Sequence, residues 1–408
     1  MKILVQKFGG SSLTNIEKRE QAIYHIVRAI EQGYSVCVVV SAMGRKGDPY
    51  ATDTLLDLIK ENGNALAARE TDMLLSCGEI ISAATLSSML NARGMKTAVL
   101  TGGQAGILTN DDHMNAQIAT INPKRIIREL ERGKIVIVTG FQGRTTEWDT
   151  TTLGRGGSDT SATALGVALK AEMVDIFTDV NGIMTADPRI VEEARPLSAI
   201  TYSEICNMAY QGAKVLHPRA VEIAMQTNIP IRVRSTFSDD EGTLVTSVTE
   251  AGRVAGEVHD RLITAIAHVS NLTQIKVLAK EGQYDLQMQV FKAMAANGIS
   301  VDFINVNLLG VVYTVHDELA DKAVAILQDM GYKPILTRRC AKVSTIGAGM
   351  QGVPGVMARI VEALTKDDIQ ILQSADSHTT IWVLVKEEDM VRAVRALHRT
   401  FDLDKVQY

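Results

Sequence analysis

The stretch TTTLGRGGSDTSATALG, from Thr150 to Gly166, joins a glycine-rich turn to the start of a helix. Its three glycines let a ligand approach the backbone and leave N–H groups exposed to it. A helix that begins near Ser158–Asp159 adds the positive end of its dipole, and Arg155 adds a planar guanidinium that suits a carboxylate or a phosphate. The stretch therefore predicts an anion site that contains one acid, Asp159. The alternative is a plain glycine-rich turn that Ser158 caps.

The N-terminal segment predicts a parallel α/β sheet around this stretch. A strand at Lys2–Phe8 runs into Gly9-Gly10-Ser11-Ser12, and a helix at Asn15–Gln32 and a strand at Ser35–Val40 follow. Such sheets bind ligands at the carboxyl ends of their strands. The turn has neither the GxGxxG spacing of a dinucleotide site nor that of a P-loop, so it predicts another kind of nucleotide site. Lys7 is placed to reach a phosphate, although a lone lysine at a strand end is more often just solvated.

Other predicted strands also end in turns of small residues. Ser41-Ala42-Met43-Gly44 follows the second strand, and a helix is expected to start at Thr52. A long helix at Asp72–Leu90 carries Glu79 among small residues, where an acid is able to bind an ammonium group; the default alternative is a solvated surface glutamate. Further strands at residues 97–100, 134–139, 173–178 and 229–234 complete one α/β domain over residues 1–245.

The composition narrows the class of protein. The chain has 408 residues, 46% of them hydrophobic and 22% charged, which is typical of a soluble globular protein with two or three domains. A net charge of −5 and the lack of a long basic run argue against nucleic-acid binding. The four cysteines (Cys37, Cys77, Cys206, Cys340) have no metal spacing, so we expect reduced thiols in a cytoplasm. We expect no signal peptide and no membrane span.

The remaining residues predict two similar units. Residues 246–261 are polar and resemble a linker, and two βαββαβ patterns follow at 273–338 and 341–408, typical of the ferredoxin-like fold. The second pattern has only Asp404–Tyr408 for its last strand, which is short and polar. A good strand at Leu262–Val269 has no place in the first pattern. We therefore expect this strand to complete the sheet of the second unit, with the first unit inserted within the second.

Several motifs, in this order and spacing, resemble those of monofunctional bacterial aspartokinases over nearly the whole chain. They are Lys7-Phe8-Gly9-Gly10-Ser11-Ser12, Ser41-Ala42-Met43-Gly44, Ser76-Cys77-Gly78-Glu79, Gly154-Arg155-Gly156-Gly157-Ser158-Asp159, Thr178-Asp179-Val180, Thr185-Ala186-Asp187-Pro188-Arg189 and Gly212-Ala213-Lys214. The resemblance implies an amino-acid-kinase (carbamate-kinase-like) αβα sandwich followed by two ACT units. It also implies transfer of the γ-phosphoryl group of MgATP to the β-carboxylate of L-aspartate.

The same resemblance implies roles for individual residues. Lys7 and Lys214 would stabilise the phosphates, Asp159 would hold both lysines, and the Gly9 and Gly10 N–H groups would hold the moving phosphoryl group. Arg155 would bind the α-carboxylate of aspartate and Glu79 its ammonium group, with further contacts from Ser41, Thr52 and Ser158. The nucleotide loop would contain Thr178, Asp179, Asp187 and Arg189. Magnesium would arrive with ATP, since the sequence offers no separate cage of carboxylates.

The ACT units imply control by an amino-acid end product and a homodimer. The second unit has Pro354-Gly355 before its helix, as ACT domains usually do, whereas the first has Gly282-Gln283-Tyr284-Asp285. The segment Gln373–His378 is similar to that of the diaminopimelate-sensitive isoform, and lysine and threonine are the other candidate effectors. A different interpretation is that the ACT units serve only as a dimerisation scaffold.

The sequence also bears on three rival functions. Another kinase on this fold, such as glutamate 5-kinase or N-acetylglutamate kinase, disagrees with the paired ACT units and with Gly154–Asp159. A catalytically dead amino-acid sensor would be favoured by loss of Lys7, Asp159 or Lys214, and all three are present. Nucleic-acid binding disagrees with the acidic balance.

Overall fold

The computed structural model of the chain describes residues 1–61, 63, 65–213, 215–247, 262–279, 283–350 and 352–405. These residues form two compact units. The first holds residues up to Ile183, Pro196–Ala209 and the described part of Lys214–His259. The second holds Met184–Arg195, Tyr210–Ala213 and the described residues from Leu262 onward.

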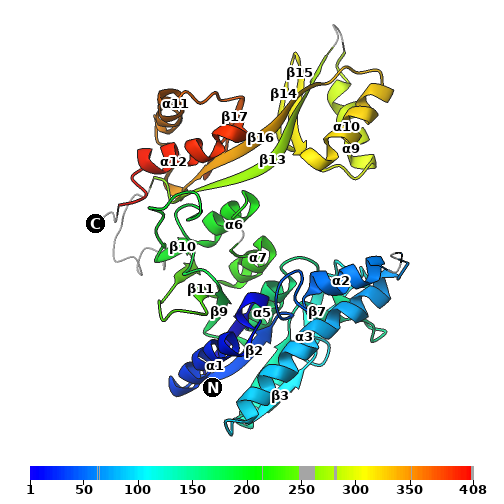
Figure 1. The fold of residues 1–408 in the computed structure, drawn as a ribbon, viewed down its shortest axis with the longest axis vertical. Coiled ribbons are helices and arrows are strands. Elements are labelled where there is room, and N and C mark those ends of the chain that lie inside the picture. Colours follow the sequence, from blue (N-terminus) through cyan, green and yellow to red (C-terminus); the bar gives the residue numbers. More distant parts are fainter. Residues whose placement is uncertain are drawn as a thin grey trace. The chain divides into compact units, whose positions relative to one another are not determined.

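An eight-stranded sheet forms the centre of the first unit (Figure 1). Its strands are β1 (Ile3–Phe8), β2 (Ser35–Val40), β3 (Thr97–Leu100), β6 (Ile135–Thr139), β9 (Met173–Thr178), β10 (Ala199–Thr201), β11 (Ile231–Ser235) and β12 (Thr243–Thr246). They lie in the order β10-β12-β11-β9-β1-β2-β6-β3, and neighbours run parallel except for β11 and β12. The apolar runs ILVQKF, SVCVVV and IVIVT are almost wholly buried, as strands covered on both faces must be.

Helices cover both faces of this sheet. On one face, α1 (Ile16–Glu31) and α3 (Ala68–Asn91) pack Ile26 and Leu86 against Val38 and its neighbours. On the other face lies α5 (Gly157–Leu169), whose Gly166 leaves no room for a side chain beside Val174. The unit also contains α2 (Thr52–Glu61), α4 (Lys124–Glu131), α7 (Pro218–Thr227), the short η1 (Gly10–Ser12) and all of α6 (Tyr202–Tyr210) except its last residue.

A small second sheet in this unit was not expected from the sequence. It contains β4 (Ile107–Thr109), β5 (Ile118–Ile121), β7 (Gln142–Arg144) and β8 (Thr150–Thr152), in the order β5-β4-β7-β8. These strands are three or four residues long, which is too short to show an alternating pattern. Strand β8 leads directly into the glycine-rich turn before α5.

The second unit is built around two long strands, β13 (Ala265–Leu278) and β16 (Ile335–Ile346), which run through its whole sheet (Figure 1). The sequence suggested two separate strands in each place. Asn271 and Arg339 interrupt the apolar pattern there, and both adopt a positive φ, with a register shift between Val269 and Leu272. Local irregularities of this kind bend a strand without ending it.

Each half of this sheet has the strand arrangement of a βαββαβ unit. The first half orders its strands as β14 (Asp302–Asn307), β15 (Gly310–His316), β13 and β16, with helices α9 (Leu286–Ala296) and α10 (Asp317–Asp329). The second half orders them as β17 (Gln373–Asp376), β18 (Thr380–Lys386), β16 and β13, with α11 (Val356–Lys366), α12 (Met390–Thr400) and the short η2 (Ala348–Met350) and η3 (Glu387–Asp389).

The strand expected to cross over lies at the start of β13. Its residues Ala265–Val269 pair antiparallel with Lys342–Ile346 of β16. Most of the expected linker, residues 248–261, lies outside the described residues. The domain boundaries 1–245, 246–261 and 262–408 therefore stay predictions.

Two earlier segments of the chain pack within the second unit. Ala186 and Val191 are buried in the same core as Ile263 and Ile360, and the Ile266 N–H donates to the Thr185 carbonyl over 2.8 Å. The Ser344 hydroxyl donates to the side-chain oxygen of Gln211 over 3.2 Å. At Gly212 the positive φ and the His268 carbonyl, which a Cβ would meet at 2.1 Å, leave room only for glycine. The core of this unit thus includes residues that precede position 245.

Helix α3 is long and apolar enough to cross a membrane by length and composition alone. Half of its most apolar window is buried inside the protein, and its buried residues include Asp72 and Glu79. These features are those of a core helix in an α/β domain.

Candidate active site

Glycine-rich turns follow β1, β2 and β6 at one edge of the large sheet. Because these neighbouring strands are parallel, their carboxyl ends meet there. The Gly44 N–H donates to the Gly10 carbonyl over 3.0 Å, and the Gly140 N–H donates to the Val40 carbonyl over 2.9 Å. A Cβ at Gly10 would lie 2.6 Å from two carbonyl oxygens, so only glycine allows this approach.

Lys7 and Asp159 form an ion pair at this edge. The Lys7 Nζ lies 2.6 Å from the Asp159 Oδ1, and both side chains are largely buried, with 12% and 13% exposed. Asp159 lies in the first turn of α5, where the helix dipole favours an anion. The helix starts at Gly157, after Gly156 in the left-handed conformation, close to the expected Ser158–Asp159. Residues far apart in sequence thus meet where phosphate binding was predicted.

The Gly9 N–H is partly used within the protein. It donates to the Phe177 carbonyl over a long 3.4 Å, and a Cβ at Gly9 would lie 3.5 Å from the Lys7 amine. The turn therefore lies directly beside the lysine. The role of the Gly9 and Gly10 N–H groups toward a phosphoryl group stays a prediction.

Glu79 is buried, with 1% of the residue exposed. Its Oε1 accepts the Ala42 N–H over 3.0 Å, and its Oε2 has no hydrogen-bond partner within the described structure. Burial raises the pKa of this carboxyl group to about 8. The alternative of a solvated surface glutamate is therefore wrong, and in its ionised form the buried oxygen needs a donor that a ligand can supply.

The other expected aspartate contacts lie around the same turns. Ser41 is half-buried beside Ala42, and Thr52 is the first residue of α2 and also half-buried. Ser158 is buried next to Gly140, where a Cβ would lie 3.0 Å from the serine hydroxyl.

Arg155 is exposed between two glycines of positive φ, Gly154 and Gly156. A Cβ at Gly156 would lie 2.1 Å from the His217 ring, so the turn is closely packed on one side. Among the residues that the structure describes, no hydrogen bond or ion pair holds the Arg155 guanidinium. The side chain is available for an anionic ligand.

The residues expected in the nucleotide loop fall in two places. Thr178 and Asp179 follow β9, and Asp179 forms an ion pair with Arg45, a residue for which the sequence suggested no role. Asp187 and Arg189 belong to the second unit and form a two-pronged pair, with Nη2–Oδ2 2.7 Å and Nε–Oδ1 3.0 Å. The hydrogen bonds from Arg189 lower the pKa of Asp187. Lys214 lies outside the described residues.

A cavity of 750 Å³ lies in the second unit, between the start of α11 and strand β17. It includes Gly355 of the Pro-Gly turn and the polar residues Ser374, Asp376, Ser377 and His378. These are the two segments that the sequence singled out in the second ACT-like pattern. Of the corresponding turn of the first pattern, Gly282-Gln283-Tyr284-Asp285, Gly282 lies outside the described residues.

Comparisons with known proteins agree with this description. The Amino acid kinase family profile matches residues 2–235, and an ACT domain profile matches residues 335–399. Aspartokinase 1 of Bacillus subtilis (strain 168) is 61% identical over 405 residues, which covers 99% of this chain and 100% of that protein. The aspartokinase of Geobacillus stearothermophilus is 42% identical over 413 residues, 99% of this chain and 98% of that protein.

A solved structure shows the same fold over nearly the whole chain. E. coli aspartokinase III in complex with aspartate and ADP superposes with a TM-score of 0.78 at 26% identity, covering 98% of this chain and 99% of that one. The same enzyme in complex with lysine and aspartate gives a TM-score of 0.75, covering 98% and 100%.

Proposed function

The chain belongs to the aspartokinases, within the amino acid kinase family, and from this premise we propose how its residues perform and control the reaction. The enzyme transfers the γ-phosphoryl group of ATP to the β-carboxylate of L-aspartate and produces 4-phospho-L-aspartate. This is the first step toward lysine, threonine, methionine and diaminopimelate. The carboxylate of aspartate is itself the nucleophile, so the protein mainly positions the reactants and neutralises charge.

Lys7 and Asp159 stabilise the phosphoryl group in this proposal. Lys7 places a cation beside the Gly9-Gly10 turn, and Asp159 holds that amine in position over 2.6 Å. A fixed cation at the point where negative charge develops lowers the barrier of phosphoryl transfer. Lys214 is proposed as a second cation, and Thr178, Asp179, Asp187 and Arg189 as nucleotide ligands, on the resemblance alone.

The single observation that carries the aspartate site is the buried Glu79 oxygen, which has no hydrogen-bond partner among the described residues. An ammonium group beside it would supply both the missing hydrogen bond and the opposite charge. Arg155, exposed and unpaired among the described residues, has the planar fork that binds a carboxylate. We assign Glu79 to the ammonium group and Arg155 to the α-carboxylate, with Ser41, Thr52 and Ser158 as hydroxyl contacts.

Magnesium is proposed to enter with ATP. No group of three or more His, Cys, Asp or Glu side chains is arranged to hold a metal in the described ranges. Mg²⁺ usually keeps several waters and binds through phosphates and one or two carboxylates, which fits a metal carried by the nucleotide. Bound there, it would neutralise charge on the β- and γ-phosphates.

The second unit is proposed to be regulatory. Its cavity, with Asp376, Ser377 and His378, has the polar groups that an amino-acid effector needs. Diaminopimelate is the effector that we favour, with lysine and threonine as alternatives. We also propose a homodimer through the ACT units, the domain limits 1–245, 246–261 and 262–408, and a cytoplasmic location without nucleic-acid or membrane partners.

The proposed function is tested by ATP-dependent phosphorylation of aspartate, trapped with hydroxylamine as the hydroxamate. The assay is run alone and with lysine, threonine, both together or meso-diaminopimelate. Suppression by one effector supports regulation and identifies that effector. Activity that none of them changes would reduce the ACT units to a scaffold. No hydroxamate at all would bring forward the sensor or another acid substrate.

A further inference from the structure

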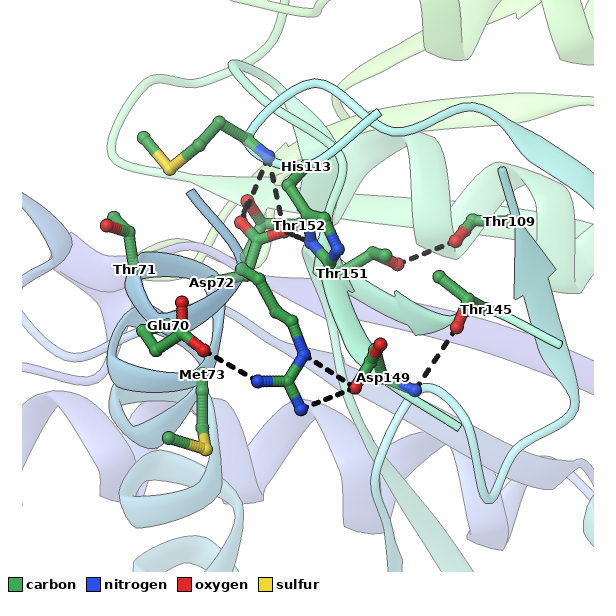
Figure 2. A network of polar contacts seen from close by, with 12 residues as sticks. Glu70, Thr71, Asp72, Met73, Thr109, His113, Thr145, Asp149, Thr151 and Thr152 are labelled. Atoms are coloured by element: carbon green, nitrogen blue, oxygen red, sulfur yellow. Dashed lines mark hydrogen bonds and ion pairs between the residues drawn. The ribbon is translucent and has the colours of Figure 1, made fainter. Parts of the chain in front are cut away.

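Asp72, in the first turns of α3, is a fully buried carboxylate that the proposed mechanism does not use. In the described structure no lysine or arginine pairs with it. Its two oxygens accept hydrogen bonds from the Met114 N–H at 3.1 and 3.2 Å, from the Thr152 hydroxyl at 2.5 Å and from the His113 Nδ1 at 2.7 Å. Figure 2 shows these groups converging on the carboxylate. A buried charge is tolerated only with such complete hydrogen bonding.

The loop that contains His113 and Met114 is held in an uncommon conformation. Met114 has a φ of +72°, which a residue with a side chain seldom adopts and which the surrounding contacts must maintain. The N–H of this same residue points to Asp72. The carboxylate therefore fixes the loop at its strained position.

Further hydrogen bonds and close contacts connect this loop to the residues that immediately precede Arg155. The Ala116 N–H donates to the Thr152 carbonyl over 2.9 Å. Arg219 donates to the carbonyls of Leu153 and Ala116, at 3.1 and 3.0 Å. A Cβ at Gly154 would lie 2.9 Å from the Asn115 Oδ1, so the turn rests on the same loop. These contacts thus fix the segment from Thr152 to Gly154, which immediately precedes Arg155.

Helix α3 also carries Glu79, about two helical turns beyond Asp72. The start of this helix, through Asp72, therefore fixes the turn that carries Arg155. The middle of the same helix carries Glu79, the other charged residue assigned to aspartate. Any shift of the loop or of β8 relative to α3 changes the distance between Arg155 and Glu79, the two groups proposed to bind aspartate.

We propose that Asp72, through its bonds to His113, Met114 and Thr152, is a positioning residue for aspartate: it locks the Arg155 turn to the helix that carries Glu79. This inference rests on the proposed roles of Arg155 and Glu79. It predicts that weakening the hydrogen bonds of Asp72 lowers the affinity for aspartate specifically, because small displacements of binding groups reduce the free energy of binding.

Two adjacent threonines provide a matched test in the full-length enzyme. Thr152 and Thr151 are both fully buried in β8, but the Thr152 hydroxyl binds Asp72, whereas the Thr151 hydroxyl pairs with Thr109 at 2.7 Å (Figure 2). Thr152→Val is expected to raise the KM for aspartate roughly fivefold to tenfold, with the KM for ATP changed less than about twofold. Thr151→Val is expected to leave both constants within about twofold. Equal effects of the two variants on the KM for aspartate would overturn the proposal.

Asp72→Asn is expected to act in the same direction as Thr152→Val and more strongly, since it removes the charge that all three donors bind. His113→Ala is expected to raise the KM for aspartate, and His113→Asn to restore most of the loss, because an amide N–H takes the place of Nδ1–H. The thermal midpoint is measured for every variant. A variant that loses stability while both KM values move together would count against positioning.

A double-mutant cycle with Arg155→Ala separates this inference from the proposed function. If Thr152 acts by positioning Arg155, adding Thr152→Val to Arg155→Ala should raise the KM for aspartate no further. Multiplied effects would refute the positioning role. If Arg155→Ala leaves the KM for aspartate unchanged, the assignment of Arg155 fails and the inference with it. If Arg155→Ala raises the KM and Thr152→Val does not, only the inference fails.

Discussion

At the scale of single residues, Glu79 gives a prediction about protons. Burial raises its pKa to about 8, so its carboxyl group holds a proton in the free enzyme at pH 7. The ammonium group of aspartate favours the ionised form, so binding should release this proton. We expect calorimetric titrations at pH 7, in buffers of different ionisation enthalpy, to show proton release that is absent in Glu79→Gln. Equal release by both proteins would refute the assignment of Glu79.

The same residue makes the stability of the free enzyme depend on pH. Between its ordinary value of 4.5 and about 8, Glu79 keeps a proton in the folded chain and has lost it in the unfolded chain. The folded state then binds more protons, so the free energy of unfolding should fall as pH rises through this window. Chemical denaturation at several pH values is expected to show a flatter dependence for Glu79→Gln. A steeper dependence in the variant would contradict the buried, protonated state.

Lys7 and Asp159 are expected to act on the rate rather than on aspartate binding. Removal of either partner leaves charge on the transferring phosphoryl group without its fixed counter-charge. Lys7→Ala should lower kcat by roughly 10²-fold to 10³-fold, with a much smaller change in the KM for aspartate. Lys2→Ala is the control, because Lys2 is largely exposed and, among the described residues, pairs only with the exposed Glu172. A normal kcat for Lys7→Ala would show that the lysine has no role in catalysis.

Where a motif surrounds a residue, the sequence predicted which side chains would meet, while their roles stay predictions. Lys7 and Asp159 were expected together, and they meet at 2.6 Å. Asp72 and His113 were missed, because an acid near the start of a helix is ordinary and its partners are distant in sequence. Only the fold reveals that this acid is fully buried.

At the scale of elements, the shared strands β13 and β16 predict that the two halves of the second unit unfold together. Ile360 of α11 is fully buried in the core over one half, so Ile360→Ala should cost about 2–5 kcal/mol. Because the strands continue into the other half, amide protection in β15 should fall as well. Hydrogen exchange on the full chain measures both effects.

Ile304→Ala is the matched control for this experiment. Ile304 lies in the edge strand β14 with 48% of its surface exposed, so its truncation should change stability little. Loss of protection around α11 alone, with β15 unchanged after Ile360→Ala, would show that the two halves unfold independently.

Strands made of a continuous run of apolar and β-branched residues were predicted closely, including the four-residue β3, whereas the strands of the small sheet and the continuity of β13 and β16 were not. Strand β2 has the expected bounds Ser35–Val40, because it is a continuous run of apolar and β-branched residues. The four short strands of the small sheet have no such pattern. The continuity of β13 and β16 was hidden because Asn271 and Arg339 look like turn residues in the sequence, whereas pairing with neighbouring strands carries the chain through them.

At the scale of the whole molecule, the segments Met184–Arg195 and Tyr210–Ala213 predict that the kinase region does not function alone. A chain of residues 1–247 would leave Ala186 and Val191 without the core that buries them. We expect this fragment to give no hydroxamate, and coexpression with residues 262–408 to restore activity. Full activity of the fragment by itself would show that these contacts are dispensable. The order of the kinase and regulatory regions followed from composition and repeats, but this sharing of segments did not, because it depends on contacts between distant residues.

The long strand β13 also has a consequence for biosynthesis. Its first five residues, Ala265–Val269, are made before either half of the regulatory sheet exists, yet their partners Lys342–Ile346 leave the ribosome much later. The inserted half has all its strands once β16 has been translated, whereas the outer half must wait for β18 and α12 near the end of the message. A nascent chain that ends before residue 380 therefore has β16 without its neighbour β18. Ribosomes that terminate early would release a product with an open sheet edge, which chaperones or proteases are able to recognise.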